Sequence, residues 1–106
     1  MIYVFDIDGT ICSKTDGNYE SAEPFKKRIK KINELYKKGE TIFFQTARGM
    51  GRSGNSRQSA YHEFFELTRE QLMRWGVKYD ALFMGKPSAD FYIDDKGIKD
   101  NDFFAD

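Results

Sequence analysis

Two aspartates separated by one residue, Asp6 and Asp8, follow an apolar segment at the N-terminus and precede Gly9. The apolar segment has the composition of a buried strand, which the glycine turn would end. Because residues i and i+2 of a strand point to the same side, the two carboxylates would repel each other unless a cation or a shared proton lay between them. Carboxylate oxygens are ligands that magnesium prefers. The pair therefore predicts a divalent-metal site, and the alternative is two surface aspartates that cap a strand.

Three other polar motifs also come directly after apolar segments. Ligands bind at the carboxyl ends of the strands in an open parallel sheet, so motifs at these ends would share one site. Taken singly, each has a plainer explanation: a β-branched strand residue, a solvated turn lysine and a turn-forming acidic pair. The three motifs are Thr46, Lys86 and Asp94-Asp95.

The elements that must position these motifs alternate between strands and helices. Helical spacing of apolar residues predicts helices over residues 22–38 and 59–75. The segment 41–46 is apolar on both faces, as buried parallel strands tend to be. This alternation predicts an α/β domain with a mostly parallel sheet. Strands are expected at residues 2–8, 41–46, 79–84 and 91–93.

Both expected helices have recognisable ends, and the first helix is rich in lysine. Ser21 is the expected cap of the first helix, and Gly39 and Gly76 are expected to end the two helices. The lysines between the apolar positions of the first helix predict a solvated face, with a nucleic-acid patch as the alternative. A net charge of zero, from 17 basic and 17 acidic residues, argues against a nucleic-acid partner but allows recognition of one phosphate group.

Length and composition set the class of protein. A chain of 106 residues with 16% aromatic content predicts one domain, 1–106, with a modest core. Cys12 is the single cysteine, which excludes an internal disulfide and fits a reducing cytoplasm. The sequence shows neither a signal peptide nor an apolar run of transmembrane length, so we expect a cytoplasmic protein without membrane contact. The many aromatic residues also make a homo-oligomer a possible state.

The four motifs, in this order along residues 2–97, resemble the signature segments of the haloacid dehalogenase (HAD) superfamily of phosphohydrolases. The aspartate pair followed by Gly9-Thr10 is the most specific element of the resemblance. The resemblance implies a Rossmann-like, three-layer α/β/α core. It also implies a magnesium-dependent phosphomonoesterase that forms an aspartyl-phosphate intermediate.

Carried over residue by residue, the resemblance implies a role for each catalytic group. Asp6 would attack phosphorus and form the aspartyl-phosphate. Asp8 would protonate the departing alcohol oxygen and then activate the hydrolytic water. Thr46 and a neighbouring backbone N–H would hold the phosphoryl oxygens. Lys86 would neutralise the charge of those oxygens and of Asp6.

The resemblance also implies a set of magnesium ligands. The metal would bind the carboxylate of Asp6, the backbone carbonyl of Asp8 and the carboxylate of Asp94. Asp95 would orient water on the metal from the second coordination shell. The cation would shield an incoming phosphate dianion from the negative charge of Asp6.

Both places at which larger relatives insert a cap domain hold only short loops here. Residues 9–20 form a flap-like loop and residues 47–58 a loop rich in glycine and arginine, so we expect no folded cap. Guanidinium groups suit planar anions, so the second loop is a candidate substrate contact; a flexible solvated loop is the alternative for Arg52 and Arg57. The candidate substrate contacts are Thr46, Ala47, Arg48, Arg52, Arg57 and Lys86.

One departure from the family pattern concerns Lys86 and Asp94, which are only eight residues apart (94 − 86). Parallel neighbours need a crossover of about a dozen residues. Residues 85–89 reach roughly 17 Å when extended, which allows a link but not a helix. The core is therefore trimmed, and whether Lys86 occupies the usual motif position stays open.

Small size, the Thr46-Ala47-Arg48 loop and the short spacing before Asp94 are similar to a narrower branch, the capsule-biosynthesis phosphatases. This resemblance implies a small phosphorylated sugar or polysaccharide-precursor metabolite as substrate. Two alternatives stay open. One is a phosphatase acting on a nucleic-acid end or a phosphoprotein, and the other is a catalytically silent binding module with the same fold.

Overall fold

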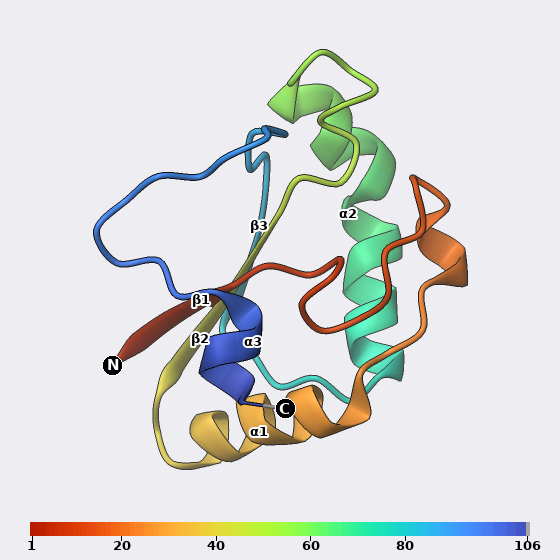
Figure 1. Cartoon of the computed structure of the whole chain (residues 1–106). Helices are drawn as coiled ribbons and strands as arrows, with labels where there is room; N and C mark the ends of the chain where they lie inside the picture. Colours follow the sequence, from red (N-terminus) through yellow and green to blue (C-terminus); the bar gives the residue numbers. More distant parts are fainter. Residues whose placement is uncertain (106) are drawn as a thin grey trace.

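The computed structural model describes residues 1–105, which form one parallel sheet of three strands with three α-helices (Figure 1). The strands β1 (Ile2–Phe5), β2 (Thr41–Thr46) and β3 (Ala81–Met84) lie in the order β1-β2-β3. The helices are α1 (Lys26–Lys37), α2 (Arg57–Arg74) and α3 (Asp100–Phe104), and a short 3-10 turn, η1, covers Tyr19–Ser21. The predicted α/β class, the parallel sheet and the lack of a folded cap are confirmed.

One face of the sheet carries the hydrophobic core. Phe5 and Phe44 are buried there against Ile32 of α1 and Leu72 of α2. Helix α3 completes this core, because the centroid of its Phe104 ring lies 6.0 Å from that of the Phe5 ring. The connections from β1 to β2 and from β2 to β3 run in the same direction along the sheet, and parallel connections of this kind are right-handed. Their helices, α1 and α2, therefore lie on the same side. All three helices therefore cover a single face.

The opposite face of the sheet is open to solvent. Side chains alternate along a strand, so Ile2 and Val4 of β1 point away from the buried Phe5. Ile2 is 67% and Val4 59% exposed, and Phe83 of β3 is 48% exposed on the same side. The ring of Phe83 packs on that of Phe43, with the ring centroids 5.3 Å apart. The described residues thus form two layers, one of helices and one of strands, rather than the three layers expected.

The predicted strand over residues 91–93 does not form. Residues 85–99 run from β3 to α3 as one wide loop, drawn in blue in Figure 1. Phe91 and Ile93 are 81% and 94% exposed. The physical reason is the short link of residues 85–90, which is below the length of about a dozen residues that a parallel crossover requires.

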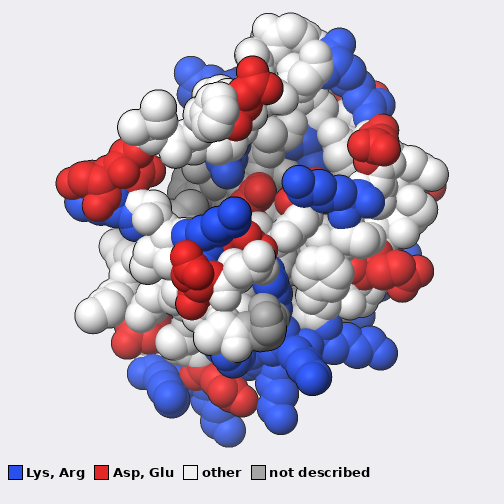
Figure 2. Space-filling model, in the orientation of Figure 1, with Lys and Arg blue, Asp and Glu red and all other residues white. Residues whose placement is uncertain are grey.

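Helix α1 begins at Lys26 rather than at residue 22, and Ser21 does not cap it. The backbone of residues 23–25 is used elsewhere, since the Phe25 N–H donates to the Ile11 carbonyl (2.7 Å) and the Glu23 carbonyl accepts from the Ser13 N–H (2.9 Å). These extended contacts fasten the 9–20 loop to the start of the helix. The lysines of α1 are exposed, as predicted, and Figure 2 shows them as a basic edge of the molecule.

Helix α2 starts close to its predicted position because Ser56 caps it, its hydroxyl accepting from the Ser59 N–H (3.3 Å). Gly39 and Gly76 follow α1 and α2 with φ of +93° and +71°, a conformation that ends helices and favours glycine. Helix α3 was not predicted, because five residues are too few to show a helical period. Within residues 1–105 no helix has both the length and the apolar character needed to cross a membrane.

Candidate active site

Three strand ends bring Asp6, Thr46 and Lys86 together at the carboxyl edge of the sheet. Asp6 comes directly after β1, and its carboxylate is 36% exposed. Its Oδ1 lies 3.9 Å from the Nζ of Lys86, which follows β3. The Lys86 backbone N–H donates to the Thr46 carbonyl (3.1 Å), so the end of β2 holds the lysine segment in place. The short spacing between Lys86 and Asp94 therefore does not prevent Lys86 from reaching Asp6.

Two opposing influences act on the pKa of Asp6. Burial raises the pKa of Asp6 above its ordinary value, and the nearby Asp8 adds to this rise. The Lys86 ammonium and the Ile7 N–H act in the other direction and lower the pKa. Lys86 is thus the side chain that most favours the carboxylate form of Asp6, the form a nucleophile needs.

Lys14 is a further basic group at this edge, which the sequence analysis did not single out. Gly9 has φ of +84°, and a Cβ added to it would lie 2.7 Å from the Lys14 Cε. The Lys14 side chain therefore folds over the turn that follows Asp8, and its charge also lowers the pKa of Asp6. No sequence signal marks this lysine, because its position depends on how the 9–20 loop turns back.

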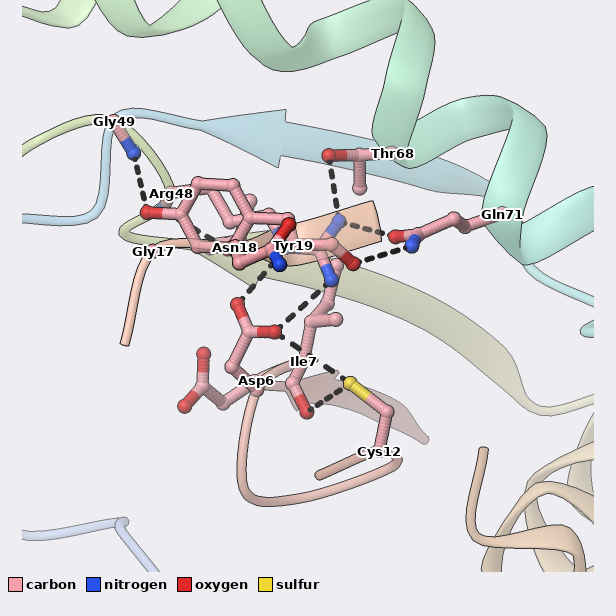
Figure 3. Close-up of polar contacts among 12 residues, drawn as sticks. Asp6, Ile7, Cys12, Gly17, Asn18, Tyr19, Arg48, Gly49, Thr68 and Gln71 are labelled. Atoms are coloured by element: carbon pink, nitrogen blue, oxygen red, sulfur yellow. Dashed lines mark hydrogen bonds and ion pairs between the residues drawn. The ribbon is translucent and has the colours of Figure 1, made fainter. Parts of the chain in front are cut away.

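Asp8 is held by a buried arginine. The Nε of Arg48 donates to Oδ2 of Asp8 and its NH2 to Oδ1, both at 2.9 Å (Figure 3). This is a bidentate ion pair, in which both oxygens of the carboxylate are fixed in direction. The Arg48 side chain is 0% exposed, whereas that of Asp8 is 23% exposed. The pair therefore orients the Asp8 carboxylate from the protein side and leaves part of it accessible.

Helix α2 and the 9–20 loop hold Arg48 in this position. Its NH1 donates to Thr68 Oγ1 (3.2 Å) and to Gln71 Oε1, both on α2. The ring of Tyr19 lies 4.8 Å from the guanidinium carbon. The Gln71 amide also donates to the Tyr19 carbonyl (2.6 Å), and the Tyr19 hydroxyl accepts from the Gly49 N–H (3.0 Å). Figure 3 shows the contacts of Arg48 with Thr68 and Gln71 and the contact of Tyr19 with Gly49.

The structure does not support the predicted contact between Arg48 and the substrate. All of its described contacts are internal, and no part of its side chain is open to solvent. A guanidinium so placed positions Asp8 rather than a ligand. The sequence analysis missed Tyr19, Thr68 and Gln71, since the network joins residues that are far apart in the chain.

Cys12 also faces Asp8. Its Sγ lies 3.5 Å from Oδ1 of Asp8 and 3.7 Å from the Ile7 carbonyl, with both oxygens as acceptors. Burial, together with the charge of Asp8, raises the pKa of the Cys12 thiol to about 12. The thiol is therefore protonated at neutral pH, which makes it a hydrogen-bond donor to Asp8 and not a nucleophile.

The remaining predicted substrate contacts differ in their access to the site. Thr46 is 1% exposed, and its hydroxyl accepts from the Arg48 N–H (3.2 Å), leaving its own proton free to donate. Ala47 is half-buried. Arg52 turns to the 9–20 loop, where it donates to the Gly17 carbonyl (2.8 Å). A Cβ on Gly85 would lie 2.6 Å from Arg57, so Arg57 passes beside the Lys86 segment.

Asp94 and Asp95 stand apart from the other motifs, in the exposed loop between β3 and α3. Oδ1 of Asp94 accepts from the backbone N–H groups of Lys96 (2.7 Å) and Gly97 (2.6 Å). These two bonds lower the pKa of Asp94. The acidic pair thus forms a turn before Gly97, the plainer explanation considered from the sequence.

A magnesium site is not assembled within one chain. Among residues 1–105, no group of three or more His, Cys, Asp or Glu side chains lies close enough together to hold a metal ion. Asp94, the second carboxylate predicted to bind the metal directly, lies in the exposed loop and gives one oxygen to its own turn. The Asp6 carboxylate does lie at the strand ends, where it is 36% exposed and faces Lys86. The predicted set of Asp6, Asp8, Asp94 and Asp95 therefore does not fit the metal in this arrangement.

Comparison with known proteins identifies the fold. No protein-family model matches the chain, and neither does any curated protein. A crystal structure of a protein from Vibrio cholerae matches with a TM-score of 0.90 and 26% sequence identity, over 98% of this chain and 87% of that one. D,D-heptose 1,7-bisphosphate phosphatase from B. bronchiseptica, crystallised with magnesium and phosphate, matches with a TM-score of 0.56 and 17% identity. That match covers 84% of this chain and about half (51%) of that protein. The chain therefore has a HAD-like core fold without a cap, similar to that of a sugar-bisphosphate phosphatase.

Proposed function

We propose that this protein is a phosphomonoester hydrolase of the HAD type, with Asp6 as its nucleophile. The observation that carries the proposal is the pairing of Asp6 with Lys86, at 3.9 Å, where the strands end. A carboxylate beside an ammonium at the ligand-binding edge of a parallel sheet suits attack on a phosphate dianion. The same fold in a phosphatase crystallised with phosphate supports this reading of the edge.

The proposed reaction has two steps. In the first, an Asp6 oxygen bonds to phosphorus while the bond from phosphorus to the alcohol oxygen breaks, and that oxygen takes a proton from Asp8. In the second, Asp8 takes a proton from water as the water oxygen bonds to phosphorus, while the bond from phosphorus to the Asp6 oxygen breaks, which releases phosphate and restores the Asp6 carboxylate. Asp8 can take and give this proton while it is bound to Arg48, because each carboxylate oxygen keeps a second lone pair. Lys86 stabilises the charge on the transferred group.

A small phosphorylated metabolite, such as a sugar phosphate or a polysaccharide precursor, is the proposed substrate. The site edge has no cap over it, and the similar phosphatase from B. bronchiseptica is named for a heptose bisphosphate. Arg57 and Lys14, which lie beside the Lys86 segment and the Gly9 turn, are the basic groups available to a second anionic group. We retain magnesium as the proposed cofactor, on the ground that this phosphatase was crystallised with it.

The test is hydrolysis of a panel of phosphate monoesters, including an aryl phosphate and sugar phosphates, with magnesium or calcium. We expect activity with magnesium, and Asp6→Asn should lower it by more than about 10³-fold because the nucleophile is lost. Asp90→Asn is the matched control, since Asp90 is an exposed aspartate away from the strand ends, and it should keep wild-type activity. Unchanged turnover in Asp6→Asn would refute the assignment of the nucleophile. An inactive wild-type chain would favour a silent binding module.

A further inference from the structure

The backbone of Lys86 is fixed more firmly than its side chain. The Lys86 N–H donates to the Thr46 carbonyl (3.1 Å), and the Arg57 side chain passes close beside Gly85, the preceding residue. The ammonium lies at the end of a four-carbon stem, and holding such a stem in one rotamer costs conformational entropy. Its ion pair with Asp6 is long, at 3.9 Å. This pair alone restrains the ammonium weakly, so a further contact with it matters for the geometry of the site.

The ring of Tyr92 provides such a contact. The Nζ of Lys86 lies over this ring, 4.3 Å from its centroid. A cation within about 6 Å of the centroid of an aromatic ring is attracted by the negative charge of the ring face. The Lys86 side chain is 22% exposed, so water screens the contact less than it would at an open surface. The ammonium thus has two partners at the strand ends, the carboxylate of Asp6 and the ring of Tyr92.

The hydroxyl of Tyr92 fixes the ring in this place. It donates to the Pro87 carbonyl (2.5 Å) and accepts from the Ala89 N–H (3.3 Å). These two bonds close residues 87–92 into a compact turn directly after Lys86. The hydroxyl and the ring of Tyr92 therefore have separate tasks, since the first holds the turn and the second contacts the ammonium.

This turn is also fastened to another loop at the edge of the sheet. The Ser88 N–H donates to Oδ1 of Asn55 (2.9 Å), which belongs to the glycine- and arginine-rich loop of residues 47–58. The bond joins residues that are 33 positions apart in the chain. The turn that carries Tyr92 is therefore held from outside as well as from within.

Exposure distinguishes Tyr92 from its two neighbours. Phe91 and Ile93 are 81% and 94% exposed, whereas Tyr92 is 53% exposed. Of these three residues, which were predicted to form a strand, only the middle one turns its side chain back onto the chain. The structure thus uses Tyr92 as a contact for Lys86 where the sequence predicted a strand residue.

We propose that Tyr92 is a positioning residue, whose ring holds the Lys86 ammonium beside Asp6 at the strand ends. Because the ring is neutral, it restrains the ammonium without cancelling its charge, as a second carboxylate would do. The charge therefore stays available to the phosphoryl group that is transferred. Only this catalytic consequence rests on the proposed phosphatase function, and the contact itself does not.

The first test is an NMR measurement that does not depend on activity. Protons over the face of an aromatic ring are shifted upfield by the ring current, so the Lys86 Hε resonances should lie upfield of those of exposed lysines. Lys86→Met identifies these resonances, because its spectrum lacks them. Tyr92→Leu should remove the upfield shift, and Tyr92→Phe should retain it. Tyr61→Leu is the matched control, since Tyr61 is 55% exposed on α2, and it should leave the shift unchanged.

Three NMR results would overturn the proposal. One is the absence of an upfield shift of the Lys86 resonances in the wild-type chain. Another is a shift that survives Tyr92→Leu. The third is a shift lost equally in Tyr92→Leu and Tyr92→Phe, because the hydroxyl and not the ring would then hold the lysine.

The second test is hydrolysis of an aryl phosphate with magnesium. Tyr92→Leu should lower kcat/KM by about tenfold, which corresponds to about 1.4 kcal/mol of transition-state stabilisation, and Tyr92→Phe should restore most of the loss. In the Lys86→Met background, Tyr92→Leu should have no further effect, since Tyr92 acts through the lysine. An equal loss in both backgrounds would overturn the positioning role. A wild-type chain that is inactive but shows the Lys86 shift would refute the proposed function while supporting the contact.

Discussion

The two acidic pairs of this chain lie in opposite environments. Asp6 and Asp8 sit at the end of a core strand, and Asp8 is fixed by a fully buried Arg48. Asp94 and Asp95 lie in an exposed loop, where the Asp94 carboxylate accepts from the backbone of its own turn. Both pairs belong to the same family resemblance, but one chain builds only the first of them into a site. The difference teaches that a motif can be complete in sequence while its parts stay separate within one chain.

The largest expected effect concerns the acidic pair at the strand ends. Asp8→Asn should lower activity by about 10²–10⁴-fold, because both proton transfers of the proposed reaction are lost. Asp102→Asn, at an exposed aspartate of α3, is the control and should keep wild-type activity. Equal activity of the two variants on an aryl phosphate would contradict the role proposed for Asp8.

The next effect concerns the charge that faces Asp6. Lys86→Met should lower activity by roughly 10²–10³-fold, because a group that stabilises the transferred phosphoryl charge is lost. The Lys86 ammonium lowers the pKa of Asp6, so its removal raises that pKa. The acid limb of the pH profile of kcat/KM should therefore move to higher pH. Lys78→Met, at an exposed lysine that precedes the amino end of β3, should leave the profile unchanged. An unshifted acid limb in Lys86→Met would contradict the role assigned to Lys86.

A stability effect separates the buried pair from an exposed one. Arg48→Met leaves Asp8 without its ion-pair partner, and we expect the free energy of unfolding to fall by about 3 kcal/mol. Arg52→Met is the control, since Arg52 is 46% exposed and its ion pair with Glu63 is long (3.8 Å), so its loss should cost less than about 1 kcal/mol. Urea unfolding measures both. Similar losses in the two variants would show that Arg48 contributes no more than a surface arginine.

The smallest effect is the alkaline behaviour of Cys12. Its thiol has a pKa of about 12 in the folded protein, against 9.0 as the ordinary value. Between these values the unfolded chain loses the thiol proton while the folded protein keeps it, so stability falls as pH rises above 9 and is unaffected by this group below it. Cys12→Ala should therefore reduce the slope of stability against pH in this interval by up to about 1.4 kcal/mol per pH unit. Parallel slopes for the two proteins would contradict the raised pKa.

Local patterns were sufficient to predict most of the fold. The alternation of apolar segments and helical periods located the three strands and the two long helices, since each depends on residues close in sequence. The order of polar motifs after the strands also predicted that Lys86 would lie near Asp6. The start of α1 could not be predicted this way, because it depends on backbone hydrogen bonds between residues 23–25 and the distant 9–20 loop. The absence of the strand at 91–93 could not be predicted either, because it depends on the length of the link of residues 85–90.

The sequence by itself determined which groups stand at the carboxyl edge of the sheet, because strand direction and period place the residue after each strand. Only the tertiary structure decided what those groups face. Arg48, next to the Thr46 motif, turns inward because Thr68, Gln71 and Tyr19 form a buried polar site for it across 20 to 29 residues of chain. Asp94 stays outside because the link before it is too short to fold back. The physical reason is the same in both cases: these contacts are set by packing and chain connection between distant segments, which no local pattern contains.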